Sequence, residues 1–186
     1  MPRKSIVELE VQAISDFPDN TAQLITPAKL RGFVLDFLKT MSPFYGLLQN
    51  GATLKSVAIT PTPTAIQNWD AFNISDLSMM TINAVAGTIT RTERGVCRVT
   101  IQATCIADNN SIVTFSIYQN GLATGYQVTI VGVPGTDPQS VNMVAVLDAP
   151  APLSIYTLRM SATTNQTVQI NNCGFIVENI PNRTFE

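Results

Sequence analysis

The chain has 186 residues, of which 45% are hydrophobic and 13% are charged, and its net charge is −2. The hydrophobic content excludes a disordered chain, and the near-neutral charge offers no basic surface for nucleic acid or for an anionic membrane. The sequence contains no run of about 18 apolar residues, so it predicts no membrane-spanning helix. We therefore expect a globular protein with no nucleic-acid partner and no membrane insertion. With so few charges, its polar surface must consist mainly of Thr, Ser, Asn and Gln, which favours an all-β body.

Residues 1–23 alternate briefly between apolar and polar side chains and then reach the turn-forming cluster Asp16-Phe17-Pro18-Asp19-Asn20. This pattern predicts an extended arm that either pairs with a neighbouring chain or docks on a partner, and a simple disordered tail is the alternative. The start MPRKSIVELE lacks the apolar core of a secretory signal, so we expect the protein to be made in a cytoplasm. The predicted anchoring residues are Ile6, Leu9, Val11, Ile14 and Phe17.

Residues 24–45 carry a helical pattern. Thr26 can cap a helix, and Pro27 suits its first position because a proline has no N–H to leave unsatisfied. Apolar side chains then recur at spacings of three and four until Pro43 ends the pattern. One amphipathic helix of this length needs a partner surface. A seam of three helices and packing on the chain's own β-domain both remain open; the predicted seam residues are Leu30, Phe33, Val34, Phe37 and Met41.

The segment TPTPTA at residues 60–65 follows one short predicted strand at residues 53–60. Pro61 and Pro63 donate no ladder hydrogen bond, so the segment is typical of a stiff linker. We therefore predict two parts: an anchoring arm, helix and linker at residues 1–65, and a head domain at residues 66–186.

From Ile66 onward, short apolar runs alternate with turn signals and show no helical period, which predicts an antiparallel jelly-roll sandwich. The clearest strand is GVCRVTIQATC, in which Cys97, Val99, Ile101, Ala103 and Cys105 share the core side. Further strands are predicted at residues 112–119, 126–133, 141–147, 153–162 and 167–180.

Catalysis has little support in the sequence. The chain contains no histidine, and its three cysteines show no CxxC pair, so we expect buried free thiols, no metal and no cofactor. The carboxylates of the head domain are scattered and fall mostly at turns, where Asp serves backbone hydrogen bonding. We expect no enzyme activity. Polar loop tips are a better prospect for glycan recognition, although they can equally face water; the candidate residues are Asn109, Asn110, Asn120, Tyr126, Gln139 and Asn165.

The order of these features resembles a known family. Residues 66–180 are similar to the jelly-roll head shared by tumour-necrosis-factor-like and complement-globular-head-like proteins, many of which occur in phage virions. The resemblance is carried by Trp69, the GVCRVTIQATC strand, FSIYQNG at 115–121, LSIYTLRMSA at 153–162 and the closing VQINNCGFIVENI. The usual Gly-Asp turn before the late strand is absent, and Ala149-Pro150-Ala151-Pro152 stands in its place. FPDNTAQLITPAKLRGFVLDFLKTM at 17–41 resembles a segment near the N-terminus of phage fibre proteins.

The resemblance implies a homotrimer with a non-enzymatic role in a phage virion, assembled in the host cytoplasm. The short chain favours a head-decoration or short head-fibre protein, bound to other virion proteins of capsid or tail through its N-terminal region. A tail fibre or receptor-binding adhesin that recognises host-surface glycans is the alternative.

Overall fold

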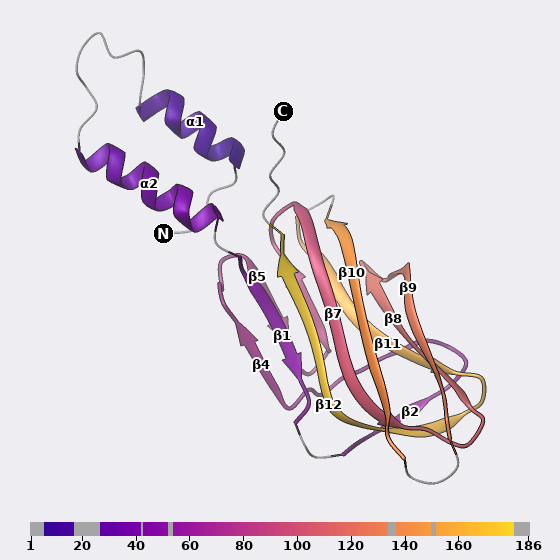
Figure 1. The fold of residues 1–186 in the computed structure, drawn as a ribbon. Coiled ribbons are helices and arrows are strands. Elements are labelled where there is room, and N and C mark those ends of the chain that lie inside the picture. The colour runs from indigo at the N-terminus through magenta and orange to yellow at the C-terminus, as the bar shows by residue number, and fades with distance from the viewer. Residues whose placement is uncertain are drawn as a thin grey trace. The chain divides into compact units, whose positions relative to one another are not determined.

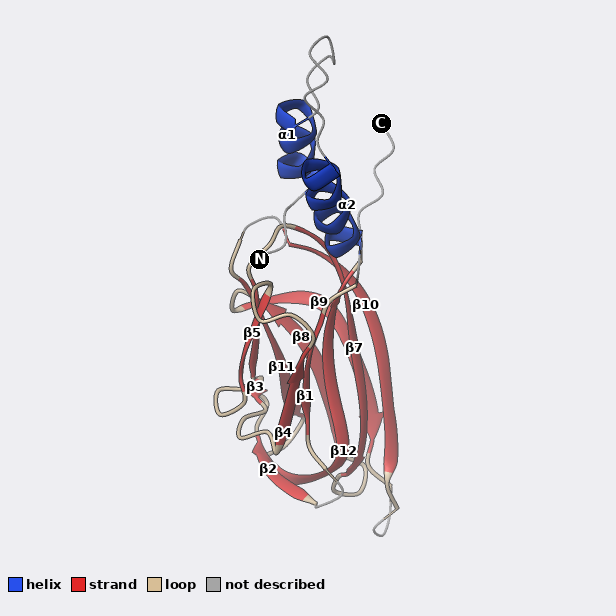
Figure 2. Ribbon diagram, turned by 90° about the vertical axis from the view of Figure 1, so that its left-hand side faces the viewer, coloured by secondary structure: helices blue, strands red, loops and turns tan. Residues whose placement is uncertain are grey.

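The computed structural model describes residues 6–16, 27–41, 43–51, 54–133, 137–149 and 152–180. These residues fall into two compact units that divide between Pro43 and Phe44. The first unit holds the helices and the second holds all the strands, as the colours of Figure 2 show. Among the residues described, no helix is both long and apolar enough to cross a membrane.

Helix α1 (Ile6–Asp16) replaces the extended arm expected at the N-terminus, so that prediction was wrong. Ile6, Leu9 and Ala13 are spaced by three and four residues, which suits a helix as well as the partial alternation suits a strand. The segment contains no Gly or Pro, and Glu8 lies in the first turn, where a negative charge is favourable. Helix α1 lies beside α2 (Figure 1), and Leu9 is buried.

Helix α2 (Pro27–Met41) confirms the predicted helix and its start at Pro27. Gly32 and Phe33 are half-buried and Asp36 is buried, so these three positions mark one covered side of the helix. The opposite side leaves apolar side chains exposed. Thr26, the expected cap, lies outside the described residues.

The β-unit consists of two antiparallel six-stranded sheets, which confirms the predicted jelly roll. Sheet A contains β10 (Gln139–Ala149), β7 (Gly95–Ile106), β12 (Gln166–Asn179), β1 (Tyr45–Gln49) and β4 (Ala71–Ile74), with β2 (Lys55–Ile59) also paired to β12. Sheet B contains β5 (Met80–Asn83), β6 (Thr88–Arg91), β11 (Ser154–Ala162), β8 (Ile112–Gln119) and β9 (Leu122–Val131), with β3 (Thr64–Ala65) also paired to β11. From β6 to β12 the chain passes repeatedly from one sheet to the other, which holds the two layers together.

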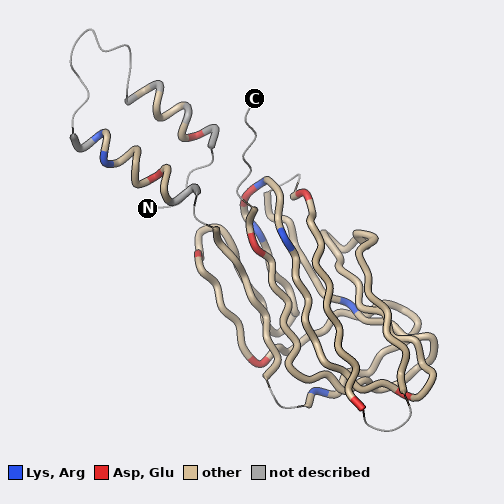
Figure 3. Tube along the Cα trace, viewed as in Figure 1, with Lys and Arg blue, Asp and Glu red and all other residues tan. Residues whose placement is uncertain are grey.

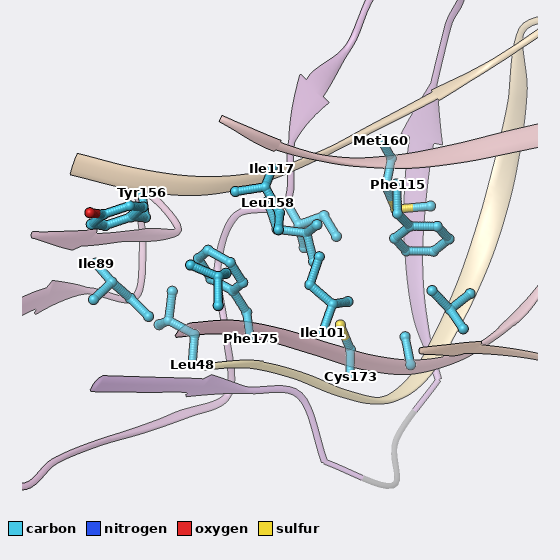
Figure 4. Close-up of a cluster of buried hydrophobic side chains, with 14 of the residues drawn as sticks. Leu48, Ile89, Ile101, Phe115, Ile117, Tyr156, Leu158, Met160, Cys173 and Phe175 are labelled. Atoms are coloured by element: carbon cyan, nitrogen blue, oxygen red, sulfur yellow. The ribbon is translucent and has the colours of Figure 1, made fainter. Parts of the chain in front are cut away.

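The core lies between the sheets, where side chains of one sheet point toward those of the other (Figure 4). In β7 the alternation is as predicted: Cys97, Val99, Ile101, Ala103 and Cys105 are all buried. Phe115 and Ile117 of β8 and Leu158 of β11 meet them from sheet B, and Phe175 of β12 lies on the same side as Ile101. The alternating pattern therefore fixes which face of each long strand is internal.

The segment at residues 45–65 belongs to the β-unit and is not a linker. Strand β1 pairs with both β12 and β4, β2 pairs with β12, and β3 pairs with β11. The unit limit lies at Phe44 rather than at residue 66. Prolines 61 and 63 are compatible with this pairing because they precede the two residues of β3.

Lys55 connects the segment at residues 45–65 to the residues that follow it. Its Nζ donates hydrogen bonds to the carbonyl oxygens of Gln67, at 2.5 Å, and Asn68. Gly51 N donates to Asp70 Oδ2 at 2.9 Å beside it. Burial lowers the pKa of Lys55, and the charge of Asp70 opposes that shift.

The sandwich has two ends that differ in chemistry. We call the end that holds Phe44 and Ile180 the proximal end, because the chain enters and leaves the β-unit there. The distal end is the opposite one, where β12 begins and where β10 starts beside Cys105.

Arg91 is buried at the proximal end and hydrogen-bonds to several elements there. The side chain is only 2% exposed. Its Nη1 donates to the carbonyl oxygen of Gly95 at 2.9 Å, and its Nη2 donates to the carbonyl oxygen of Arg94 at 2.9 Å and to Asn179 Oδ1 at 2.7 Å. The guanidinium also lies over the Phe44 ring, 5.7 Å from the ring centroid. Arg91 thus joins the end of β6, the start of β7, the end of β12 and the first residue of the β-unit.

We expect Arg91→Met to lower the free energy of unfolding by about 2–4 kcal/mol, because it leaves buried oxygen acceptors without a donor. Arg98→Met is the matched control: Arg98 is exposed and paired with Glu178, so its loss should cost only about 0–1 kcal/mol. Urea unfolding followed by circular dichroism measures both values. Equal values for the two variants would contradict the role given to Arg91.

Candidate interaction surfaces

The distal end presents several of the exposed polar loop residues. Asn109, Asn110 and Asn165 are exposed there, and Gln139 is half-buried at the first position of β10, beside Cys105. Four of the six predicted recognition residues therefore lie at one end of the sandwich.

Gln166 holds the distal loops to one another. It is buried at the start of β12; its Oε1 accepts a hydrogen bond from Asp108 N at 2.9 Å, and its Nε2 donates to Ser111 Oγ. Thr163 adds a second connection, since its Oγ1 accepts from Ile112 N at 3.3 Å and its N donates to Ile112 O at 3.1 Å. The loop at 107–111 and the turn at 163–165 are thus tied together.

Gly132 brings a third loop into this cluster. Its N donates to Ser111 O at 2.8 Å, and its O accepts from Asn110 N at 2.9 Å. A Cβ at this position would lie 1.9 Å from the carbonyl oxygen of Asp108, so only glycine permits the approach. The distal end is consequently a preorganised surface of amide and hydroxyl groups.

The other two predicted recognition residues lie elsewhere. Asn120 is at the proximal end, in the turn between β8 and β9, and has a positive φ of 51°. Its Oδ1 accepts from Ile155 N at 2.8 Å, so its side chain ties the turn to the start of β11. Tyr126 is 41% exposed within β9 rather than at a loop tip.

The outer face of sheet A mixes apolar side chains with one ion pair. Val144 and Val146 of edge strand β10 are more than half exposed, and they oppose Thr100 and Arg98 of β7. Arg98 Nη2 lies 2.5 Å from Glu178 Oε2 across the β7–β12 pair. A long edge strand with outward valines suits association with another chain. The sequence analysis did not predict this surface, although Val144 and Val146 occupy even-numbered positions that alternate with the inward side chains of β10.

A second apolar surface lies along the opposite edge of the sandwich, on and beside β4 and β5. Phe72, Leu77 and Val85 are 59%, 76% and 70% exposed. Large apolar side chains exposed to this degree on separate edges suit contacts with another protein or with further copies of the chain.

The helical unit carries the third apolar surface. Leu30, Val34, Phe37 and Leu38 of α2 are each exposed by 43% or more. Three of these are predicted seam residues and share one side of the helix; Phe33 is half-buried, and the side chain of Met41 lies outside the description. Of the predicted anchoring residues, Val11 is 63% exposed and Leu9 is buried. The side chains of Ile6 and Ile14 are not described, and Phe17 lies outside the described residues.

The three thiols are free and buried, as predicted. Burial raises the pKa of Cys105 to about 11 and that of Cys173 to about 12. Burial also raises the pKa of Cys97, and the hydrogen bond from Cys97 Sγ to the Tyr156 hydroxyl, at 3.3 Å, opposes that rise only in part. A nucleophilic or metal-binding cysteine needs the opposite shift. Within the described ranges, no group of three His, Cys, Asp or Glu side chains could hold a metal ion.

Cys97, Cys105 and Cys173 should resist alkylation in the folded protein, because neither reagent nor thiolate is available in the core. We expect negligible labelling by iodoacetamide at pH 8 and complete labelling of all three in guanidinium chloride, measured by intact mass. Ser140→Cys places a thiol at an exposed position of β10 and serves as the positive control. Rapid labelling of the native thiols at the rate of this control would contradict the assignment.

Comparison with known proteins adds little to this geometry. No protein-family model matches the sequence, and no curated protein matches it. Among solved structures, Eiger TNF from S. frugiperda is similar with a TM-score of 0.47 and 14% identity, covering 78% of this chain and 98% of that one. Murine APRIL is similar with a TM-score of 0.48 and 8% identity, covering 73% of this chain and 99% of that one. Likeness at this level does not bear on activity, ligand or partner.

Proposed function

We propose that this chain is a non-enzymatic, homotrimeric structural protein of a phage virion, either a head-decoration protein or a short head fibre. In this proposal, residues 1–43 bind another virion protein of the particle and the jelly roll is exposed to solvent. The protein is assembled in the host cytoplasm and then resides in the virion. The sequence resemblance to phage fibre segments and jelly-roll heads motivates the virion role.

The apolar side of α2 is the observation that carries the proposal. Leu30, Val34 and Phe37 are spaced by four and three residues, are 50%, 43% and 46% exposed, and continue along one side of the helix. Such a stripe is unstable in water and suits a seam between parallel copies of the same helix. Packing of three copies would bury it.

The two edge surfaces of the β-unit support a ring of three. The outward valines of β10 and the Phe72, Leu77 and Val85 surface lie on different edges of one chain. Two different surfaces that contact each other in successive copies form a heterologous interface, which closes into a ring when the rotation is one third of a turn. The same contact would cover both exposed surfaces.

We expect light scattering of the purified chain to give the mass of three chains. Phe37→Glu places a charge in the seam and should raise the dissociation constant of the trimer by about tenfold or more. Arg31→Ala, at an exposed and polar position of the same helix, is the matched control and should leave the trimer intact. A monomeric wild-type protein would disprove the trimer.

Attachment is tested separately, with particles that lack the protein. Full-length chain should bind them, whereas a chain of residues 44–186, with its sheet content checked by circular dichroism, should not. Binding by the shorter chain would show that the β-unit carries the attachment site.

A tail adhesin that recognises host glycans is the second candidate, and the preorganised distal end favours it. The exposed amides of Asn109, Asn110 and Asn165 are held by fixed loops, which lowers the entropic cost of binding. In that case the purified protein should compete with the phage for host cells, and Asn109→Ala with Asn110→Ala should weaken the competition. No competition by wild-type protein would exclude this candidate.

A further inference from the structure

Sheet B has an outer face of unusual chemistry. Its strands contain no Asp or Glu, and among their residues Arg159 is the only charged one that faces outward, because the other arginine of these strands, Arg91, points inward. Figure 3 shows how sparse charge is along the strands of the β-unit. The positions that alternate with the buried ones are mostly hydroxyl-bearing: Thr81, Thr88, Thr90, Thr114, Ser116, Thr129, Thr157 and Ser161.

Strand pairing gathers part of this set around Arg159. Ser116 of β8 is its direct cross-strand partner, and Thr157 and Ser161 lie two positions away along β11. Tyr118 of β8 opposes Thr157, and its ring centroid lies 4.2 Å from Arg159 Cζ. We call Thr114, Ser116, Tyr118, Thr157, Arg159 and Ser161 the Arg159 patch.

The hydrogen-bonding capacity of Arg159 is unused within the described part of the chain. No carboxylate or carbonyl oxygen there accepts from its guanidinium, and its buried Nε lacks an acceptor. The two Nη groups are not among the buried unpaired atoms, so they reach solvent. Arg98, in contrast, is paired with Glu178, and Arg91 donates to three oxygen atoms. Among the strand arginines described, Arg159 alone has only an aromatic ring as its partner.

The surrounding hydroxyls are also available. In the same described residues, Ser116, Thr157 and Ser161 show no side-chain hydrogen bond, whereas Thr114 Oγ1 lies 3.3 Å from Thr129 Oγ1. The guanidinium lies over the Tyr118 ring, and this contact restricts where it can move before any ligand arrives. A fixed guanidinium fork recognises a planar carboxylate, and neighbouring hydroxyls can donate to or accept from sugar hydroxyls.

We propose that the Arg159 patch binds an acidic saccharide, with the carboxylate of a uronic acid on the Nη groups of Arg159 and sugar hydroxyls on Ser116, Thr157 and Ser161. Hydroxyl-bearing positions continue onto the neighbouring strands: Thr88 of β6 is paired with Thr157, and Thr129 of β9 is paired with Thr114. Hydroxyl groups spread over four strands favour an extended oligosaccharide over a free anion. The proposal does not depend on the virion role, and it uses a different surface from the distal loops.

The test uses the full chain and two matched tetrasaccharides. One alternates glucuronic acid with N-acetylglucosamine, and the other alternates glucose with N-acetylglucosamine in the same linkages, so they differ only in their carboxylates. Isothermal titration calorimetry should detect the acidic tetrasaccharide and show at least about tenfold weaker binding of the neutral one. Amide NMR shifts should fall on Ser116, Thr157 and Ser161.

Variants locate the site. Arg159→Met keeps an apolar side chain over Tyr118 but removes the charge, and should weaken binding by about tenfold or more. Arg159→Lys keeps the charge without the fork and should bind with intermediate affinity. Arg98→Met, on the other sheet, should bind like wild type. Circular dichroism confirms that each variant is folded.

Three outcomes would overturn the proposal: no binding by wild type up to about 10 mM acidic tetrasaccharide, equal binding by Arg159→Met, or equal binding of both tetrasaccharides. The last measurement is a competition with inorganic sulfate. If sulfate at equal concentration displaces the acidic tetrasaccharide completely, the patch is a plain anion site and the saccharide assignment is wrong.

Discussion

The pairing of β12 with three other strands is the constraint on which the β-unit depends. Its first half pairs with β2 and its second half with β1, while β7 runs along its other side. Val168 and Ile170 face inward at even positions, whereas Cys173, Phe175 and Val177 face inward at odd positions. The bulge between Asn171 and Gly174, with Asn172 at a φ of 47°, makes this change of parity possible. Without it, one half of β12 would direct its apolar side chains to solvent.

This arrangement has consequences for folding and for the ends of the chain. Of the strands described, the last is the partner of the first, so sheet A forms only through contacts between residues distant in sequence, a topology that is associated with slow folding. The same pairing brings Phe44 and Ile180 to one end, where Asn179 N donates to Phe44 O at 2.8 Å. Arg91 then links that end to β6. The chain neither enters nor leaves the β-unit at the distal end, where the loops are fixed by their own hydrogen bonds.

The sequence predicted correctly those elements whose residue pattern fits only one type of secondary structure. Strand β7 alternates strictly because one face is buried, and α2 starts at Pro27 because proline tolerates only the first turn. Helix α1 was missed because Ile6, Leu9 and Ala13 satisfy a helical period within a segment that also alternates. The strands β1 to β3 were assigned outside the head because each pairs with β12 or β11, more than 90 residues away in the sequence, and no local pattern shows such pairing; β1 pairs in addition with the nearer β4.

Candidate sites were harder to predict than strands. Asn110 and Asn120 attracted attention as exposed amides, yet both have positive φ values, so asparagine is also required there by the turns themselves. The Arg159 patch could not be predicted, because Ser116, Tyr118 and Arg159 come together only through the register of β8 with β11.

In a chain with so few charges, the partners of the three arginines that lie on strands separate structural roles from binding roles. Arg91 is enclosed by oxygen acceptors and Arg98 is neutralised by Glu178, so both act within the fold. Arg159 is held in orientation by Tyr118 without being neutralised. The apolar outer valines and ion pair of sheet A suit contact with protein, whereas the hydroxyl-rich face of sheet B suits a hydrated ligand. Assembly through the outer face of sheet A and the two edges of the sandwich would therefore leave the outer face of sheet B free to bind.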